Sequence, residues 1–570
     1  MQIGIMTDQS KLSAYIAEIL KTWGLPIFAP VSGDMVPGLA PAEFPVLVCP
    51  AYHDEAALPD YARRGGTVLC FLPGRALARA AGLKVRGTKE PPLRLRNVAY
   101  PTGGLAGEFV PVVGPVHAWE RSETAKPLAY LSHPGRYGGE TAGIAETVLG
   151  GGRIVSFAFD LPRCVLLLRQ GDPELAENIP DGDGCARPTH MAARVGPYDA
   201  GWIPHADLLS RLFTDLVRRY LPAPVPVLSH LPRTAPGVLL YSGDEDYADV
   251  ASNEDEFDGV AGAGGRMSLY IIPNHTKSTP DDVARYARLH DVGPHPNLRP
   301  LDGRPVRERV AEFERQVRLF EKTFRTPALT VRNHCTAWAG YLDLVDVMEK
   351  LGVQMDGNYF SGTYMKDRES APYAAFGAAL PMRFCHPDGR LVNVYQQHTH
   401  LTDDGMFGAQ DYSYKLSPAV FSVMIERIFT DIATRFHTPY GVCIHPGNWV
   451  KFSEKQGREL LRLANEKGLP IWSFDQWAAF WSARDTWRFA DLRWNGSKLG
   501  FSLQGGSPHP DLRIQIPLRF AGASVGEIRV DGKKARTDRD VRYRERVGFV
   551  SVPEGRSTAS IEAVFHPNPN

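Results

Sequence analysis

Ionisable side chains follow several apolar, strand-like runs in the middle of this chain. The first run, VLLYSG, stops at three consecutive acids, Asp244, Glu245 and Asp246. Acids are common in exposed turns, but their burial beside a core strand is unfavourable unless something compensates the charge. Later runs of the same kind are followed by His295, by Arg332 and His334, by His398 and His400, by Asp403 and Asp404, and by His445.

Carboxylate oxygen together with neutral imidazole nitrogen is the ligand set of a catalytic zinc ion or a related divalent metal. Such a site keeps one coordination position open for water or substrate. A separate carboxylate could take a proton from that water, and a separate histidine could return a proton to the leaving group. These residue types therefore predict a hydrolase that uses a divalent metal, with zinc as the expected ion.

The elements that would have to position these residues lie between positions 237 and 484. Apolar strand-like runs alternate there with amphipathic helical segments, giving seven or eight units over about 250 residues. This alternation favours a closed β/α barrel, in which reactive groups sit at the carboxyl ends of the strands. In that fold the histidines and acids would meet on one rim.

On these motifs the region resembles the NodB-type polysaccharide deacetylases. The resemblance lies in YSGDEDY, in HDVGPHPN and in VCIHPGNW, in that order. It implies that Asp244 is the base, that Glu245 or Asp246 is a metal ligand and that His295 is another. The chain departs from the family at Arg299, where a second histidine is usual.

The remaining site residues follow from the same rim. His334 is the substitute expected for the missing third ligand, because it also ends a strand. The resemblance implies that His445 is the acid, and Arg332, which ends the same run as His334, is placed with the catalytic residues. The expected substrate contacts are His398, His400 and Trp449, which complete the candidate site.

Two other functions remain open on the sequence alone. A glycoside hydrolase on a related barrel would use paired carboxylates, such as Asp244 and Asp403, and would require no metal. A carbohydrate-binding protein that has lost catalysis is the other alternative, and the departure at Arg299 favours it.

The flanking regions predict two further fold units. Residues 1–222 alternate strands and helices, which predicts a flavodoxin-like open sheet. This region resembles the class I glutamine-amidotransferase fold, but Cys49 lacks the flanking glycines of that nucleophile, so a non-catalytic role is expected. Five prolines from Pro222 to Pro236 predict a stiff linker over 223–236. Short alternating runs over 485–570 predict a β-sandwich.

Composition limits the function classes further. The 570 residues carry 64 basic and 64 acidic side chains, so bulk charge indicates neither a nucleic-acid nor a membrane partner. The beginning of the sequence lacks the features of a signal peptide, and no apolar run reaches the length of a membrane span. Seven scattered cysteines favour a reducing cytoplasm. The expected partner is a carbohydrate substrate, and assembly into a homo-oligomer is left open.

Overall fold

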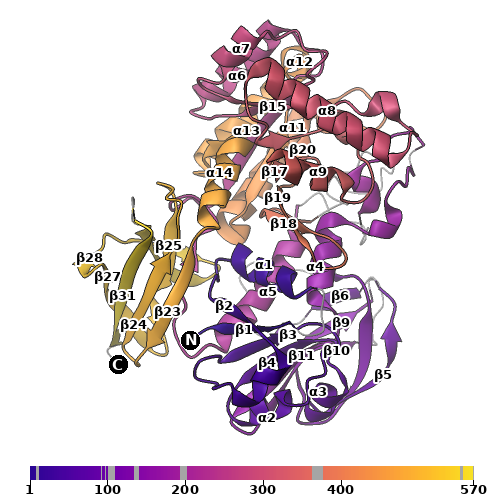
Figure 1. Cartoon of the computed structure of the whole chain (residues 1–570). Helices are drawn as coiled ribbons and strands as arrows, with labels where there is room; N and C mark the ends of the chain where they lie inside the picture. The colour runs from indigo at the N-terminus through magenta and orange to yellow at the C-terminus, as the bar shows by residue number, and fades with distance from the viewer. Residues whose placement is uncertain are drawn as a thin grey trace.

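The protein is a mixed α/β protein in which Figure 1 distinguishes three regions. No helix in the part of the chain described here is long and apolar enough to cross a bilayer. The computed structural model describes residues 1–7, 12–91, 93–96, 98–99, 110–133, 140–180, 182–192, 202–361, 377–552 and 556–568.

The N-terminal region is built on one nine-stranded sheet. Five of its strands are parallel, as an open α/β sheet requires, and four antiparallel strands extend it. Cys49 ends a buried strand, where burial holds the pKa of its thiol well above the usual range, and this supports a non-catalytic role. In spatial order the strands are β2 (Phe28–Val31), β1 (Ile3–Met6), β3 (Val46–Cys49), β4 (Thr67–Phe71), β11 (Gly152–Phe157), β10 (Thr141–Leu149), β9 (Lys126–Ser132), β6 (Leu93–Arg96) and β7 (Val110–Val112).

A separate strand pair and several α-helices also belong to the described part of this region. The pair joins β5 (Leu83–Lys89) to β8 (Val116–Arg121) in antiparallel register. The α-helices are α1 (Ser13–Thr22), α2 (Leu58–Arg63), α3 (Arg75–Ala80), α4 (Leu161–Gln170) and α5 (His205–Arg219).

The described residues of the central region form two sheets, and among them the closed barrel that the sequence predicts is not found. The first is entirely parallel, and the second contains one antiparallel pair, β18 with β19. The first sheet contains β15 (Asp291–Pro294), β14 (Ser268–Ile271), β13 (Val238–Asp244), β21 (Pro439–Cys443), β20 (Leu401–Thr402) and β22 (Ile471–Trp472); the second contains β16 (Thr330–Val331), β17 (Met355–Asp356), β19 (Leu391–Gln396) and β18 (Met382–Cys385).

The two sheets separate between β15 and β16. These strands lie side by side, and a Cβ at Gly293 would meet the carbonyl oxygen of Thr330 at 2.8 Å. They belong to different sheets and do not pair in register, although β16 pairs with β17 on its other side. Among the described residues, therefore, hydrogen bonds do not close a ring of strands.

Helices cover the central sheets, and two of them begin with a reciprocal cap. The side chains of Thr279, before α7, and Ser473, before α14, each accept from the backbone amide of the third helical residue. The side chain of that third residue accepts in turn from the backbone amide of Thr279 or Ser473. The helices are α6 (Val250–Gly262), α7 (Pro280–Tyr286), α8 (Val306–Phe324), α9 (Asp343–Leu351), α10 (Asp403–Phe407), α11 (Pro418–Asp431), α12 (Pro446–Asn448), α13 (Glu454–Glu466) and α14 (Phe474–Arg484).

The C-terminal region holds two antiparallel sheets. A Cβ at Gly548 would meet Ile528 at 3.6 Å, so the sheets contact each other across a shared core. The first sheet contains β25 (Arg513–Pro517), β30 (Glu545–Ser551) and β29 (Asp538–Arg542); the second contains β23 (Arg488–Trp494), β24 (Lys498–Gln504), β31 (Thr558–Pro567), β27 (Ala523–Val530), β26 (Arg519–Phe520) and β28 (Lys533–Lys534).

The segment expected as a linker, 223–236, is largely buried and forms a strand of its own. Its β12 (Val227–Leu228) pairs with β25, so it adds a strand to a C-terminal sheet. The buried guanidinium of Arg484 donates to the carbonyl oxygens of Thr22, Leu228 and Ser229. The segment is thus hydrogen-bonded to both the central and the C-terminal regions.

The N-terminal and central regions meet through buried polar contacts as well. Arg169 and Gln170, at the end of α4, donate to the carbonyl oxygens of Leu380 and Cys385 at 2.7 and 2.9 Å. Gln170 also accepts from the backbone amide of Cys385 at 2.8 Å. Buried polar groups of this kind need their partners, so these two regions depend on each other for satisfied hydrogen bonds.

Candidate active site

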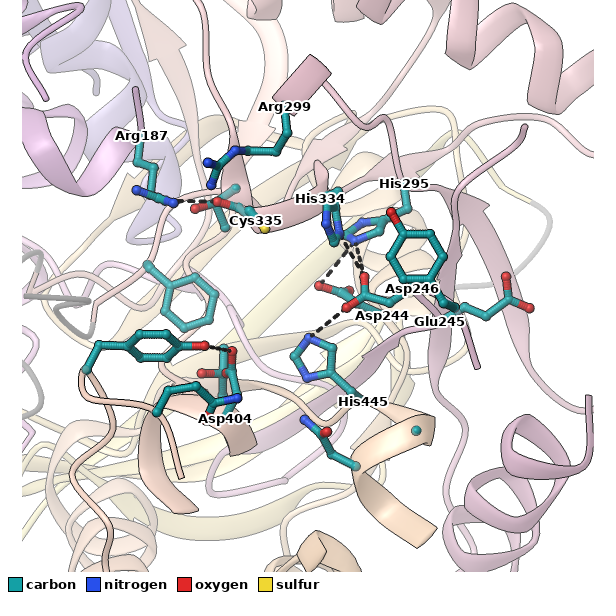
Figure 2. A pocket seen from close by; sticks show the side chains of 18 of the residues that line it. Arg187, Asp244, Glu245, Asp246, His295, Arg299, His334, Cys335, Asp404 and His445 are labelled. Carbon is teal, nitrogen blue, oxygen red and sulfur yellow. Dashed lines mark hydrogen bonds and ion pairs between the residues drawn. The ribbon is translucent and has the colours of Figure 1, made fainter. Parts of the chain in front are cut away.

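A cavity of about 830 Å³ lies at the carboxyl ends of the parallel central strands (Figure 2). Asp244 ends β13, His295 follows β15, His334 follows β16 and His445 follows β21. All four side chains line this cavity. The alternation of strand and helix thus brings residues that are far apart in sequence to one rim, as the strand-end positions predict.

Three side chains in the cavity form a candidate metal centre. Oδ1 of Asp246 lies 3.2 Å from Nε2 of His295 and 2.8 Å from Nδ1 of His334. One ligand atom from each residue lies within 4.8 Å of the other two. One carboxylate and two imidazoles are a donor set that catalytic zinc uses. The three residues therefore fit a divalent ion.

The orientation of His295 favours a cation at this position. Its Nδ1 donates to the carbonyl oxygen of Arg332 at 2.7 Å, so in a neutral ring Nε2 carries the lone pair that faces Asp246. Two acceptors facing each other repel unless a positive charge lies between them. Burial alone would lower the pKa of His334, but Asp246 raises it to about 10. The cluster thus strongly favours a positive charge at its centre.

Backbone strain is concentrated around the same cluster. Asp246, Cys335 and Thr336 have φ values of 51°, 55° and 50°, in the left-handed region that side-chain-bearing residues seldom adopt. Thr336 is β-branched, which makes its conformation the least favourable of the three. Such strain persists only where the surrounding structure holds it, and it collects at functional sites.

Asp244 lies beside the metal cluster and is held from behind by Arg332. The fully buried guanidinium donates to Oδ1 of Asp244 at 3.0 Å and packs against the rings of Tyr270 and Phe474. Burial alone would raise the pKa of Asp244, but the charge of Arg332, with those of the nearby histidines, holds it below the usual value. Asp244 is therefore an ionised, immobilised carboxylate at neutral pH.

His445 lies on the other side of the cavity and is held by Asp403. Its Nδ1 donates to Oδ1 of Asp403 at 2.6 Å, and its Nε2 lies 3.8 Å from Oδ2 of Asp246. Ser453 donates a further hydrogen bond to the buried carboxylate of Asp403 at 3.1 Å. Burial alone would lower the pKa of His445, but Asp403, Asp404 and Asp246 raise it well above the usual value. The ring is therefore protonated on both nitrogens and positively charged at neutral pH.

Glu245 points away from the cluster, although its residue borders the cavity (Figure 2). Its Oε1 accepts from Asn253 at 2.9 Å and from Ser278 at 2.6 Å. Asp244 and Asp246 share one side of the chain and Glu245 takes the other. Of the two ligands that the sequence allows here, the structure brings only Asp246 to the histidines.

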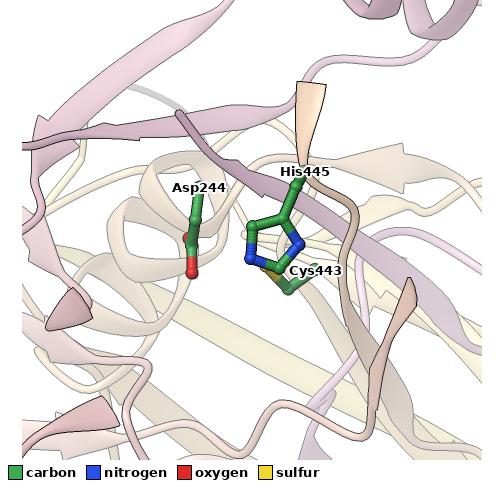
Figure 3. Close-up of side chains that lie close together, drawn as sticks. All are labelled: Asp244, Cys443 and His445. Carbon is green, nitrogen blue, oxygen red and sulfur yellow. The ribbon is translucent and has the colours of Figure 1, made fainter. Parts of the chain in front are cut away.

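A second group with possible ligand atoms contains Asp244, Cys443 and His445 (Figure 3). Burial raises the pKa of the Cys443 thiol well above its usual value. A protonated thiol is a poor ligand, because metals bind the thiolate. This group therefore fits a metal less well than Asp246, His295 and His334.

The three expected substrate contacts lie outside the cavity lining. His398 and His400 are buried, and their Nε2 atoms lie 3.2 and 2.9 Å from the carbonyl oxygens of Arg169 and Ala378. Trp449 is 2% exposed and packs against Gly259. Their rings thus fill the core and do not face the cavity.

Several lining residues have no signal in the sequence. Arg299 lines the cavity but pairs with Asp183 and Asp302, so it does not replace the missing histidine at the metal cluster. Asp403 stood out in the sequence as a strand-end acid and as one of the paired carboxylates of the alternative function, but not as the partner of His445. The lining residues that sequence reasoning missed include Pro180, Asp183, Arg187, Phe360, Tyr412 and Lys451.

No family model matches the sequence, and no curated protein matches it either. Solved structures similar to the chain include carbohydrate deacetylases. One is Agd3, at 10% identity over 99% of both chains with a TM-score of 0.42. A proposed polysaccharide deacetylase from Mycobacterium smegmatis is 13% identical over 46% of this chain and 94% of its own, with a TM-score of 0.33.

Glycoside hydrolases are also among the similar structures. A β-galactosidase from Bacillus circulans sp. alkalophilus is 14% identical over 28% of each chain, with a TM-score of 0.23. None of these similarities assigns an activity, and none supports the glutamine-amidotransferase resemblance of the N-terminal region. The function must therefore be inferred from the site residues.

Proposed function

We propose that this protein is a metal-dependent hydrolase that removes an acyl group, an acetyl group above all, from an amide or ester of a carbohydrate. The observation that carries the proposal is one cavity that combines a three-residue ligand set with an ionised acid and a protonated histidine. The carbohydrate substrate is inferred from the resemblance of the central region to the NodB-type deacetylases.

Asp246, His295 and His334 would hold the metal. A divalent ion bound there supplies polarisation of the acyl oxygen and a lower pKa for a bound water. The donor set favours zinc, because zinc takes imidazole and carboxylate ligands and leaves a position open in catalytic sites.

Asp244 would accept a proton from the attacking water. Its depressed pKa keeps it ionised, and the bond from Arg332 fixes the direction in which its other oxygen, Oδ2, points. A base must lie within hydrogen-bonding reach of the proton that it takes, and Oδ2 lies 3.8 Å from Nε2 of His295, at the edge of the metal cluster.

His445 would donate a proton to the departing amine or alcohol. Asp403 binds Nδ1, which directs the Nε2 proton into the cavity and stabilises the charged ring. The base and the acid thus stand in opposite protonation states at the same pH, which is the arrangement that acid–base catalysis needs.

The geometry gives less support to a glycoside hydrolase. That function requires two carboxylates that face the substrate. Asp403 is fully buried, does not line the cavity and is engaged by His445 and Ser453. Asp403 therefore supports the acid rather than serving as a second carboxylate at the scissile bond.

The test combines elemental analysis with acetate release. Purified protein should contain about one zinc or similar ion per chain, as a three-ligand catalytic site does. It should release acetate from N- or O-acetylated oligosaccharides, lose this activity to a chelator and recover it with added zinc. Chelator-resistant activity, or a metal-free protein that cleaves glycosidic bonds, would contradict the proposal.

A further inference from the structure

The loop that carries His334 is held by the N-terminal region. In this loop, residues 334–340, Cys335 and Thr336 have the strained left-handed backbone described above. Strained residues need an environment that fixes them. Three of the contacts that do so come from residues of the N-terminal region, more than a hundred positions earlier in the chain.

Four hydrogen bonds join the loop to Arg187, Ala186, Glu177 and Arg309. Further bonds within the central region, such as that from the amide of His334 to the carbonyl oxygen of Pro296 at 3.0 Å, hold it as well. Nε of Arg187 donates to the carbonyl oxygen of Cys335 at 3.1 Å, and the amide of Trp338 donates to the carbonyl oxygen of Ala186 at 2.8 Å. The amide of Gly340 donates to Oε1 of Glu177 at 2.7 Å. The fourth comes from Arg309 of the central region, which donates to the carbonyl oxygen of Trp338 at 2.8 Å and also forms an ion pair with Glu177.

Arg187 is itself held in place within its own region. It is 8% exposed, and it pairs with Asp183, which in turn pairs with Arg299 on the central region. Arg187 and Asp183 also line the cavity, so this segment forms one wall of the site (Figure 2). A charged side chain so enclosed is costly to leave unpaired, which fixes its geometry.

From these contacts we infer that Arg187 and Glu177 of the N-terminal region are positioning residues for the third metal ligand, His334. They act on the loop backbone and contact neither the metal position nor the reacting atoms. The inference rests on the proposed metal site. It makes the N-terminal region a part of the active centre, although that region supplies no ligand.

The test measures the affinity of metal-free protein for Zn²⁺ by competition with a chromophoric chelator. We expect Arg187→Met to weaken binding by about 10–100-fold, the range for loss of groups that orient ligands. Arg187→Lys, which keeps a donor and the charge, should recover part of that loss. Glu177→Gln, which loses the ion pair with Arg309, should weaken binding in the same direction.

The matched control is Arg218→Met. Arg218 also joins the N-terminal region to another region, through an ion pair with Glu545 at 2.9 Å, but it does not line the cavity. Its variant should bind Zn²⁺ as the parent does. If Arg187→Met does not fold, Arg187→Lys and Glu177→Gln decide the question.

The outcomes separate the inference from the proposed function. Parental affinity in folded Arg187 and Glu177 variants would overturn the inference and leave the metal site standing. A parent protein that binds no Zn²⁺ would overturn the proposed function, and with it the ligand that these residues would position. Equal weakening in Arg218→Met would show a general loss of stability and would also overturn the inference.

Discussion

The two walls of the cavity hold their proton-transfer groups by opposite means. On the wall formed by β13 and β16, the buried cation Arg332 keeps Asp244 ionised. On the wall formed by β20 and β21, the buried anion Asp403 keeps His445 protonated. Burial alone would shift the pKa of each group in the opposite direction, since burial disfavours the charged form. The partner behind each group therefore decides its protonation state, which suits one group to the proposed role of base and the other to that of acid.

The largest effect on activity is expected from the loss of Asp246, which lies between the two walls. Asp246→Ala removes a ligand and the anion between the two histidines, so it should abolish most bound metal. The loss of activity should exceed the about 10²–10⁴-fold that removing one acid or base typically costs. Metal content and acetate release measure this. Glu245→Gln is the control and should keep its metal; the reverse pattern would move the ligand by one residue.

Asp244→Asn should separate the contribution of the base from that of the metal. The side chain keeps its shape but cannot take a proton, so turnover should fall by about 10²–10⁴-fold while bound metal stays near the parental level. Rate and metal content should be measured on the same preparation. Full activity in this variant would remove the base from the mechanism.

Asp403→Asn should weaken the second wall in a pH-dependent way. Asp403 raises the pKa of His445, and an acid must be protonated to act, so the native enzyme stays active toward higher pH. Without this carboxylate the pKa of His445 falls, and the alkaline limb of kcat/KM should move to lower pH. The measurement is a pH profile with a poor and a good leaving group.

His445→Ala provides the comparison for that profile. It should remove the alkaline limb of the profile, and the loss of activity should be smaller for the good leaving group, which needs little protonation. Equal losses on both substrates would contradict the acid role.

The smallest effect on activity is expected from His400, which lies outside both walls. His400→Gln should leave KM unchanged but lower the free energy of unfolding by about 0.5–1.5 kcal/mol, because the ring bonds Ala378 and Gly441 in the core. Denaturant unfolding and kinetics check this. Tyr412→Phe, within the cavity lining, is the contrasting variant and should raise KM.

Strand-end position was enough to predict that the acids and histidines meet on one rim. The choice between Glu245 and Asp246 was not within reach, because the strand ends at Asp244 and the left-handed turn at Asp246, which no local pattern records, decides which acid faces the histidines. The pairing of Asp403 with His445 was not within reach either, since two rim residues can pair in many ways. His398 and His400 had the right type and position, but nothing local shows that their rings turn into the core.

Contacts between distant segments were beyond the sequence for a different reason. The prolines between Pro222 and Pro236 indicate a stiff segment, but they do not show whether water or protein surrounds it. Val227 and Leu228, interleaved with them, pair with β25. Arg187 lies in a loop whose contacts depend on how two regions dock, and no periodicity records that. The closed barrel was predicted from the number of units, which does not fix whether every pair of neighbouring strands forms backbone hydrogen bonds.

Arg484 has a consequence for how this protein can change over evolutionary time. One buried guanidinium satisfies carbonyl oxygens of Thr22 in the N-terminal region and of Leu228 and Ser229 in the segment before the central one. A gene fragment encoding the central region alone would lose all three of these hydrogen bonds and would expose to water the surface that now packs around this arginine. The three regions are therefore expected to be inherited together, as one indivisible piece, and not exchanged between proteins as separate modules.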